Sequence, residues 1–350
     1  MKHRDIINQI FPKKEGIFLA TLDDIAQELG ISKSTVSKAL NDAKDVSKRM
    51  KQAVLEKAVE LGYSRSARTS DAPRIAVFIT NMEYTKPDDF GYDIIMGFRQ
   101  AAEPAGYQVE TVPLTHEMQK QIRYDEYMVL NNFCGGLFLG LSLVDPWIQE
   151  FETCITPTVL YDNHISGNPK VTSIGVDNVE GIKLAFKYLR TLGHERIGYL
   201  SSALQAYVYR QRYDAFARVM TENGLSADDS VMGNHLQINS CLTQHLPRLL
   251  ENGCTAIICS HDLLANSVML HCRDLGLRVP EDISIVGFDD IPLCRYTFPP
   301  LTTIRQNRPA LGKSAFYALS CHLKGVSLST HLLHAELIRR GSCGPAPVKK

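Results

Sequence analysis

Three segments near the N-terminal end of the chain place apolar residues with helical spacing. In the first, 22–29, four apolar residues occur at i, i+3, i+4 and i+7, so they share one helical face. Thr21 precedes this segment as a candidate N-cap, and Asp24 stands three residues later, which is the spacing of a capping box. Gly30 can adopt the left-handed conformation that ends many helices. The pattern therefore predicts a short amphipathic helix between Thr21 and Gly30.

A second helix is predicted at about 33–40 and a third from Ser47 to Gly62, each preceded by a serine that can cap it. The outward face of the second helix carries short polar or cationic side chains: Lys33, Ser34, Ser37 and Lys38. Two helices joined by a tight glycine-containing turn form a helix-turn-helix, whose second helix presents its N-terminal residues to DNA base edges. Because most charged helix faces are only solvated, a plain three-helix bundle remains the alternative.

From Arg74 onward, short apolar runs alternate with helical patterns. The predicted strands are 75–80, 136–141, 158–162, 173–177, 196–201, 255–260, 283–288 and 301–306. The predicted helices are Ile94–Ala105, Val179–Leu192, Arg210–Asn223 and Leu263–Leu275. Several strands are continuously apolar, as expected for strands covered on both faces. Repeated strand–helix units predict doubly wound parallel sheets, in which ligands bind beyond the carboxyl ends of the strands.

Charged residues stand at such strand ends. Asp162 and Asp289 each follow a predicted strand, and Arg210 begins the helix after another. Two carboxylates and a guanidinium can satisfy the vicinal hydroxyls of a sugar. We therefore predict that Asp162, Arg210 and Asp289 converge on a polyhydroxylated ligand, and a carboxylate held by Arg210 is the alternative.

Neighbouring residues have plainer interpretations. Asp177, Asp262 and Asp290 are expected to be helix N-caps, because a carboxylate at a strand end most often has that role. Three tyrosines could cover an apolar sugar face, although core packing is the alternative: Tyr161, Tyr207 and Tyr209. Phe288 is expected to pack in the core.

The charge of the chain is balanced overall but uneven along its length. Lys and Arg number 38, as do Asp and Glu. Residues 1–70 contain thirteen Lys or Arg and nine Asp or Glu, a net charge of +4, so the remainder carries −4. A basic head on an acidic body is typical of a DNA-binding head with a separate regulatory body.

Other sequence features narrow the class of protein. The nine cysteines include no CxxC pair and no metal-ligand spacing, which favours reduced thiols in the cytoplasm, and we expect neither a metal nor a cofactor. No apolar run reaches membrane-spanning length, and 17–20 is too short for a signal-peptide core. Because GxSxG, GxGxxG, P-loop and HExxH motifs are also missing, we expect no enzyme, and neither an exported binding protein nor a DNA-linked enzyme is favoured.

The segments LDDIAQELGISKSTVSKALN and VSKRMKQAVLEKAVELGY resemble the lactose-repressor (LacI/GalR) family of bacterial regulators. The resemblance continues more weakly to about Ser342 through VLYDN, AIICSHD, ISIVGFDD and PPLTTIRQ. It implies an all-α helix-turn-helix head at 21–63 and an α/β periplasmic-binding-protein-like body at 74–342, made of two doubly wound parallel-sheet subdomains. The first would be 74–176 with 304–331, the second 177–303 with 332–340, and 343–350 a tail.

The resemblance also implies roles for individual residues. Lys33, Ser34 and Lys38 match positions that face base edges. Five residues match the family's phosphate-contacting or positioning residues: Thr35, Ser37, Asn41, Ser47 and Tyr63. Thr21, Leu22 and Ser32 are also expected to belong to the DNA-binding site. Asp162, Arg210 and Asp289 match effector-contacting positions, Tyr161 lies beside them, and His261 stands where the family often has Asn.

A homodimer, or a higher oligomer, would bind a near-palindromic operator in double-stranded DNA. The expected function is repression of carbohydrate-metabolism genes that a small sugar relieves. The alternative is a response to a nucleobase or another non-sugar metabolite, possibly as a corepressor.

The chain departs from the family in two places. An extension at 1–20 precedes the first helix and could be a DNA-contacting arm, a packing helix or a loose end. The linker 64–73 has no Leu, Ile or Met and ends at Pro73, which predicts a weakened or missing hinge helix and less DNA bending. Arg65 and Arg68 could still enter a narrow minor groove.

Overall fold

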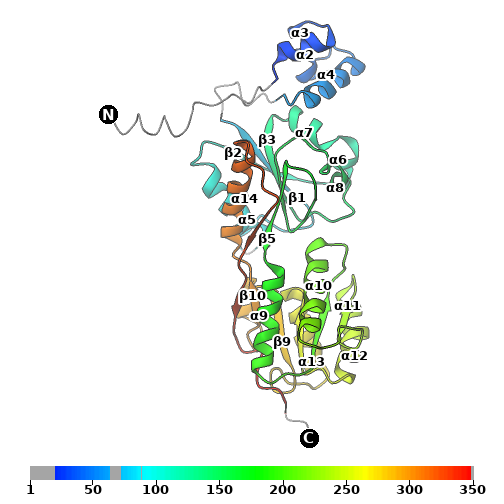
Figure 1. Cartoon of the computed structure of the whole chain (residues 1–350), viewed down its shortest axis with the longest axis vertical. Helices are drawn as coiled ribbons and strands as arrows, with labels where there is room; N and C mark the ends of the chain where they lie inside the picture. The colour runs from blue at the N-terminus through cyan, green and yellow to red at the C-terminus, as the bar shows by residue number, and fades with distance from the viewer. Residues whose placement is uncertain (1–19, 64–71, 88, 348–350) are drawn as a thin grey trace, which may run out of the picture.

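The computed structural model describes residues 20–63, 72–87 and 89–347. A helical head, a first α/β subdomain and a second α/β subdomain follow one another along the long axis of the molecule (Figure 1). The predictions for the arm at 1–20, the hinge at 64–73, and Arg65 and Arg68 fall on residues that lie almost entirely outside the described ones.

The head contains the three predicted helices: α2 (Leu22–Leu29), α3 (Lys33–Leu40) and α4 (Lys48–Glu60). Its core is formed by residues from all three helices and from both flanking segments: Ala20, Ile25, Ala26, Val36, Ala39, Val54, Ala58 and Tyr63. The apolar spacing thus places one face of every helix in a common core, as the sequence predicts.

Side-chain caps fix the ends of these helices. Thr21 and Asp24 form the complete capping box, with N–H···O distances of 2.9 and 2.6 Å. Ser32 accepts a hydrogen bond from Thr35 N and Ser47 from Met50 N. Gly30 ends α2 at φ 63°, a left-handed conformation that costs glycine little. The predicted boundaries hold because each is set by a local hydrogen bond.

The first subdomain is built on a six-stranded parallel sheet in the order β11-β5-β4-β3-β1-β2. Its strands are β1 (Arg74–Ile79), β2 (Gln108–Pro113), β3 (Phe133–Leu139), β4 (Thr158–Tyr161), β5 (Val171–Val176) and β11 (Thr330–Leu333). Its helices are α5 (Phe90–Ala102), α6 (His116–Gln121), α7 (Tyr124–Leu130), α8 (Trp147–Glu150) and α14 (Arg308–Leu323). Separate apolar clusters on the two faces explain the continuously apolar central strands.

The helices α5 and α14 lie side by side on one face of this sheet (Figure 1). Their backbones approach so closely that a Cβ at Gly312 would stand 1.9 Å from Ile94 O. A Cβ at Gly97 would stand 2.1 Å from Pro309 O. Glycine at both positions is therefore required for this packing.

The second subdomain has a six-stranded sheet in the order β12-β10-β9-β8-β6-β7, parallel except for the β10–β12 pair. Its strands are β6 (Ile197–Ser201), β7 (Met232–Asn234), β8 (Ala256–Cys259), β9 (Ser284–Asp289), β10 (Thr302–Arg305) and β12 (Glu336–Ile338). Its α-helices are α9 (Asn178–Thr191), α10 (Tyr207–Glu222), α11 (Ile238–Ser240), α12 (Leu246–Glu251) and α13 (Asp262–Asp274). A π-helix, η1 (Cys241–His245), and a 3-10 helix, η2 (Pro292–Arg295), complete it.

The chain passes between the subdomains three times. It crosses after β5, again after β10, and finally between β11 and β12. The strand β10 therefore belongs wholly to the second subdomain, and β11 wholly to the first, which moves the second and third crossings slightly from the predicted 304 and 332. The three crossings join two separate sheets, one in each subdomain.

The C-terminal segment is part of the second subdomain as far as Ala346. Ser342 Oγ donates to Ile285 O at 2.6 Å, and Ala346 N donates to Leu192 O at 2.8 Å. Gly344 O accepts from the fully buried ring of His194, at 3.1 Å. The prediction of a tail from 343 is therefore wrong for this segment, because its polar atoms bond to buried partners.

Candidate functional site

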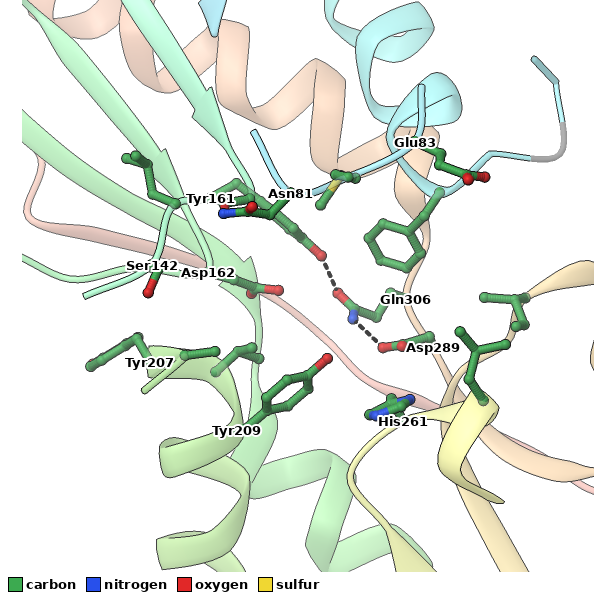
Figure 2. Close-up of a pocket in the computed structure, with 18 of the residues that line it drawn as sticks. Asn81, Glu83, Ser142, Tyr161, Asp162, Tyr207, Tyr209, His261, Asp289 and Gln306 are labelled. Atoms are coloured by element: carbon green, nitrogen blue, oxygen red, sulfur yellow. Dashed lines mark hydrogen bonds between the residues drawn. The ribbon is translucent and has the colours of Figure 1, made fainter. Parts of the chain in front are cut away.

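A cavity of about 710 Å³ lies between the two subdomains. The carboxyl ends of β1, β3 and β4 line it from the first subdomain, and the N-terminal end of α10 with the ends of β8 and β9 lines it from the second. Figure 2 shows side chains from both subdomains facing this space. The position is the one expected for a ligand of doubly wound sheets.

A chain of hydrogen bonds crosses the cavity from one subdomain to the other (Figure 2). Tyr161 Oη, at the end of β4, donates to Gln306 Oε1 at 2.8 Å. Gln306 Nε2 donates in turn to Asp289 Oδ1 at 2.7 Å. Because Gln306 lies in the second crossing, this chain ties the ligand cavity to a segment that connects the subdomains. Gln306 ends the family-like segment PPLTTIRQ, but it is not among the predicted site residues.

Arg212 contributes a guanidinium group to the wall of this cavity, and its side chain is almost fully buried. Its Nε donates to Asn178 Oδ1 at 2.8 Å, and its Nη1 donates to Ser260 O at 2.6 Å and to Asp289 Oδ1 at 3.3 Å. The guanidinium also lies 3.6 Å from the ring centroid of Phe288. Phe288 is fully buried, as predicted, and the face of its ring packs against the Arg212 guanidinium.

Arg210 does not take the position that the sequence predicts for it. It is exposed, it is not part of the cavity wall, and its Nε bonds Leu204 O at 3.2 Å. Two residues along a helix differ by roughly 200° about its axis, so Arg210 and Arg212 point in nearly opposite directions. Arg212 therefore joins Asp162 and Asp289 where Arg210 was expected.

Asp162 faces the cavity from the end of β4, pointing between Tyr209 and Gln306 (Figure 2). Burial raises the pKa of its carboxyl to about 6, against the opposing effect of Arg212. Its backbone is left-handed at φ 52°, and Gly175 leaves room for it, since a Cβ there would lie 2.7 Å from Asp162 Oδ1. The buried carboxyl and the left-handed backbone are both unfavourable for folding, and such unfavourable features are typical of binding sites.

Asp289 lies across from it at the end of β9. Burial raises the pKa of its carboxyl, while Arg212 and Gln306 oppose that change. Its backbone has φ 118°, a region that residues other than glycine rarely adopt. The two aspartates that the sequence singled out thus share one cavity and both adopt strained conformations.

His261 lines the cavity and also caps α13. Its Nδ1 accepts from Leu264 N at 3.2 Å, so the proton resides on Nε2, which donates to Ser202 Oγ at 2.6 Å. Burial, and then Arg212, lower the pKa of the ring to about 4. A neutral imidazole therefore occupies this position at physiological pH.

Tyrosine rings supply apolar surface to the same space. Tyr209 lies 5.4 Å from His261 between ring centroids, and Tyr207 stacks on His164 at 6.1 Å. Both tyrosines line the cavity together with Tyr161. The arrangement provides aromatic faces beside carboxylate oxygens, which suits a ligand with both apolar faces and hydroxyl groups.

Two of the three expected caps have other roles. Asp177 does cap α9, accepting from Glu180 N at 2.9 Å. Asp262 is instead buried and accepts from Ile291 N at 2.9 Å and from Thr303 Oγ1 at 2.5 Å. Asp290 forms ion pairs with two arginines that come from distant segments: Arg305 and Arg340. Long-range partners of this kind leave no mark on the local sequence.

The outward face of α3 is open. Lys33, Ser34 and Lys38 are exposed, with the two lysines in solvent-exposed ion pairs to Asp23 and Asp45. Such pairs contribute little stability and can be exchanged for phosphate or base contacts. The other predicted DNA-contacting residues serve as caps or core in the free head: Thr21, Leu22, Ser32, Asn41, Ser47 and Tyr63. Thr35 and Ser37 stand half-buried on α3.

Two further observations concern the described part of the chain, 20–63, 72–87 and 89–347. Nowhere in it do three His, Cys, Asp or Glu side chains come together in a way that would hold a metal ion. Within the same residues, every helix is too short or too polar to cross a lipid bilayer.

Family models match both parts of the chain. Residues 21–66 match bacterial regulatory proteins of the lacI family, and residues 186–343 match a periplasmic-binding-protein-like domain. The HTH-type transcriptional regulator MalR of Streptomyces coelicolor is 30% identical over 345 residues, covering 93% of this chain and 97% of MalR. The HTH-type transcriptional repressor CytR of Escherichia coli is 28% identical over 338 residues, covering 94% and 97%.

Solved structures share the fold along almost the whole chain. A complex of the transcriptional regulator CelR with cellobiose aligns with a TM-score of 0.65 and 22% identity, covering 92% of this chain and 99% of that one. The lac repressor dimer bound to operator and the anti-inducer ONPF aligns with a TM-score of 0.63 and 24% identity, covering 93% and 99%. The head-plus-two-subdomain architecture is therefore that of known regulators.

Proposed function

The chain belongs to the LacI family of bacterial regulatory proteins and is a DNA-binding transcription regulator, and we propose that a small sugar in the interdomain cavity controls its binding to DNA. The observation that carries this proposal is the pair Asp162 and Asp289, which meet one cavity from opposite subdomains. A sugar that donates hydroxyl hydrogens to both carboxylates would link the subdomains. Its differential affinity for the open and closed forms would shift the conformational equilibrium.

The cavity supports a hydroxyl-rich ligand better than an anionic one. Asp162 and Asp289 present acceptors, whereas the single guanidinium, Arg212, already bonds Asn178, Ser260 and Asp289. His261 is neutral and has both ring nitrogens engaged. A carboxylate ligand would therefore have to displace existing bonds. Among the structural neighbours, CelR is described in complex with a sugar, cellobiose.

A nucleobase or nucleoside is the second candidate. The rings of Tyr207 and Tyr209 border the cavity, and a planar base could stack on them while its amino groups reach the aspartates. Either ligand class could release the protein from DNA or act as a corepressor, and family membership favours release by a sugar.

We propose that the regulator acts as a homodimer on a near-palindromic operator in the cytoplasm, without catalytic activity. Large apolar side chains are exposed on and after α13 and around η2: Leu263, Leu270, Leu293, Tyr296 and Phe298. Leu263 and Leu293 also line the mouth of the same cavity. An apolar surface of this kind is typical of a subunit interface, and a second copy of this chain is the proposed occupant.

Thermal denaturation with a panel of sugars and nucleosides tests the proposed effector. We expect a neutral sugar to raise the melting temperature of the wild-type chain, but not that of a variant carrying Asp162→Asn and Asp289→Asn. Stabilisation of both proteins by the same sugar, or by nucleosides alone, would overturn the sugar proposal. A turnover assay on each stabilising sugar should detect no product.

A further inference from the structure

The third helix of the head lies against the first subdomain of the body. The helix α4 contacts α7, which stands directly beneath it in Figure 1. Val129 of α7 packs against the apolar core of the head. Gln52 Nε2 of α4 donates to Glu126 Oε1 of α7 at 3.1 Å. Leu55 and Glu126 are only 7% and 8% exposed. Head and body thus share an apolar contact and a hydrogen bond to a buried carboxylate.

This contact leaves the DNA-facing helix free. Lys33, Ser34 and Lys38 on α3 remain exposed while α4 is docked. The N-terminal end of α4, with Ser47 and Lys48, is also exposed. A docked head can therefore still present α3 to a major groove, in an orientation that the body sets.

The helix α7 is fastened to the strands that reach the ligand cavity. Tyr124 Oη lies 2.8 Å from Thr158 Oγ1 at the start of β4. The carboxylate of Asp125 accepts from the backbone amides of Ile155 and Thr156 at 3.0 and 3.1 Å. The strand β4 ends beside Asp162, and β3, which follows α7, leads to Ser142 in the cavity wall. A movement of these strands must therefore carry α7 with it.

We propose that α7 is a docking surface for α4, which holds the head in a set orientation and transmits movements of the first subdomain to it directly. The contact acts alongside the covalent linker 64–73. It does not depend on which effector occupies the cavity. In this arrangement the body holds the DNA-binding helices in one orientation. Weakening the contact between α4 and α7 would let the head reorient relative to the body.

Hydrogen exchange of the full-length chain, followed at the amides of α4 and α7, tests this docking. Val129→Asp places a charge in the apolar contact, and we expect about tenfold faster exchange in both helices. The matched control is Leu130→Asp, one residue along, at a side chain that is 41% exposed. We expect the control to leave exchange in α4 unchanged. Equal exchange in the two variants would overturn the proposal.

A second pair of variants tests the hydrogen bond without disturbing the apolar contact. Gln52→Glu sets its carboxylate against Glu126 of α7 and also against Glu56 of α4, whose Oε1 accepts from Gln52 Nε2 at 3.0 Å. The substitution should therefore also speed exchange in both helices by about tenfold. Adding Glu126→Gln restores one donor opposite one acceptor across the contact, so exchange in the double variant should return toward the wild-type rates, with the repulsion between the introduced carboxylate and Glu56 remaining within α4. Gln27→Glu adds the same charge to an exposed site on α2 and should change neither helix. Failure of the double variant to recover would contradict a direct contact.

Discussion

Two strained aspartates define the ligand cavity at the scale of single residues. Asp162 and Asp289 adopt φ values of 52° and 118°, and burial raises the pKa of both carboxyls. A protein that only needed to fold would not place carboxylates there. Burying these carboxylates destabilises the free protein. A ligand with hydroxyl donors would offset this unfavourable free energy by hydrogen bonding to them.

Replacing Asp162 by Asn should stabilise the free protein. Burial raises the folded-state pKa of Asp162 to about 6, above an unfolded value of about 3.9. The folded state therefore binds more protons between these values, and the stability contribution of this residue falls as pH rises from about 4 to about 6. We expect Asp162→Asn to raise the free energy of unfolding by about 2 kcal/mol at pH 7.5.

The same substitution should have little effect near pH 3, where the wild-type carboxyl is mostly protonated in both the folded and the unfolded state. Urea denaturation at the two pH values measures the difference. Asp282→Asn is the control of opposite sign, because Arg278 holds the pKa of Asp282 at about 2. An equal effect of Asp162→Asn at both pH values would refute the assigned cause.

Substitution by Met should lower the free energy of unfolding much more at Arg212 than at Arg210, although both residues lie on α10. Arg212→Met removes the partner of Asp289 and leaves Asn178 Oδ1 and Ser260 O without a donor. We expect a loss of about 3 kcal/mol in the free energy of unfolding. Arg210→Met alters an exposed side chain and should change it by less than about 0.5 kcal/mol. Similar urea midpoints for the two variants would contradict the assignment of the cavity position to Arg212.

At the scale of elements, the sequence predicts an element well when local hydrogen bonds fix its ends. The boundaries of α2, α3 and α4 follow from Thr21, Ser32 and Ser47, which cap them as expected. The sequence predicts a helix from Arg210, but α10 begins at Tyr207 after Ala206, which has no capping side chain. Without a local cap, the sequence does not indicate which residue of this first turn faces the cavity.

Other elements escaped prediction because tertiary contacts create them. The edge strand β2 alternates exposed and half-buried positions and contains two charged or amide side chains, Gln108 and Glu110. The short helix α7 is stabilised by bonds from Asp125 to a segment thirty residues away. Likewise, Gln306 joins the site only through partners on β4 and β9.

The helix α3 should determine sequence preference, and α4 should not. Lys33 lies on the exposed face of α3, and losing a base contact there costs about 1–3 kcal/mol for one base pair. We expect Lys33→Ala to change the preferred operator sequence. Lys48→Ala at the exposed start of α4 should weaken all sequences alike. Binding of both variants to specific and scrambled DNA, measured at fixed salt, distinguishes the two. Equal losses on both DNAs for both variants would refute the assignment.

At the scale of the whole molecule, two sheets joined by three crossings enclose the cavity, and the head rests on one of them. The family resemblance predicts this division from the head motif and the strand-end aspartates. It does not predict the docked α4, or the packed C-terminal segment, because their contacts come from residues far apart in the chain.

The proposed dimer depends on exposed aromatic side chains that follow β9. Tyr296 and Phe298 are 81% and 99% exposed. We expect Tyr296→Ser with Phe298→Ser to weaken dimerisation by at least about tenfold, since buried aromatic residues dominate subunit interfaces. Sedimentation equilibrium measures the change. Leu236→Ser is the control, at a 73% exposed residue that follows β7 at the far edge of the same sheet, and it should leave the association constant unchanged.

Ligand-dependent DNA binding by the full chain tests the central claim most directly. The probe is the DNA site recovered by in vitro selection, titrated by fluorescence anisotropy with and without the sugar that raises the melting temperature. The account predicts binding at least about 10³-fold tighter than to scrambled DNA. It also predicts a change of about 5- to 150-fold on adding the sugar, and no change in the variant carrying Asp162→Asn and Asp289→Asn. Tight, selective binding that no stabilising sugar alters in the wild-type protein would contradict it.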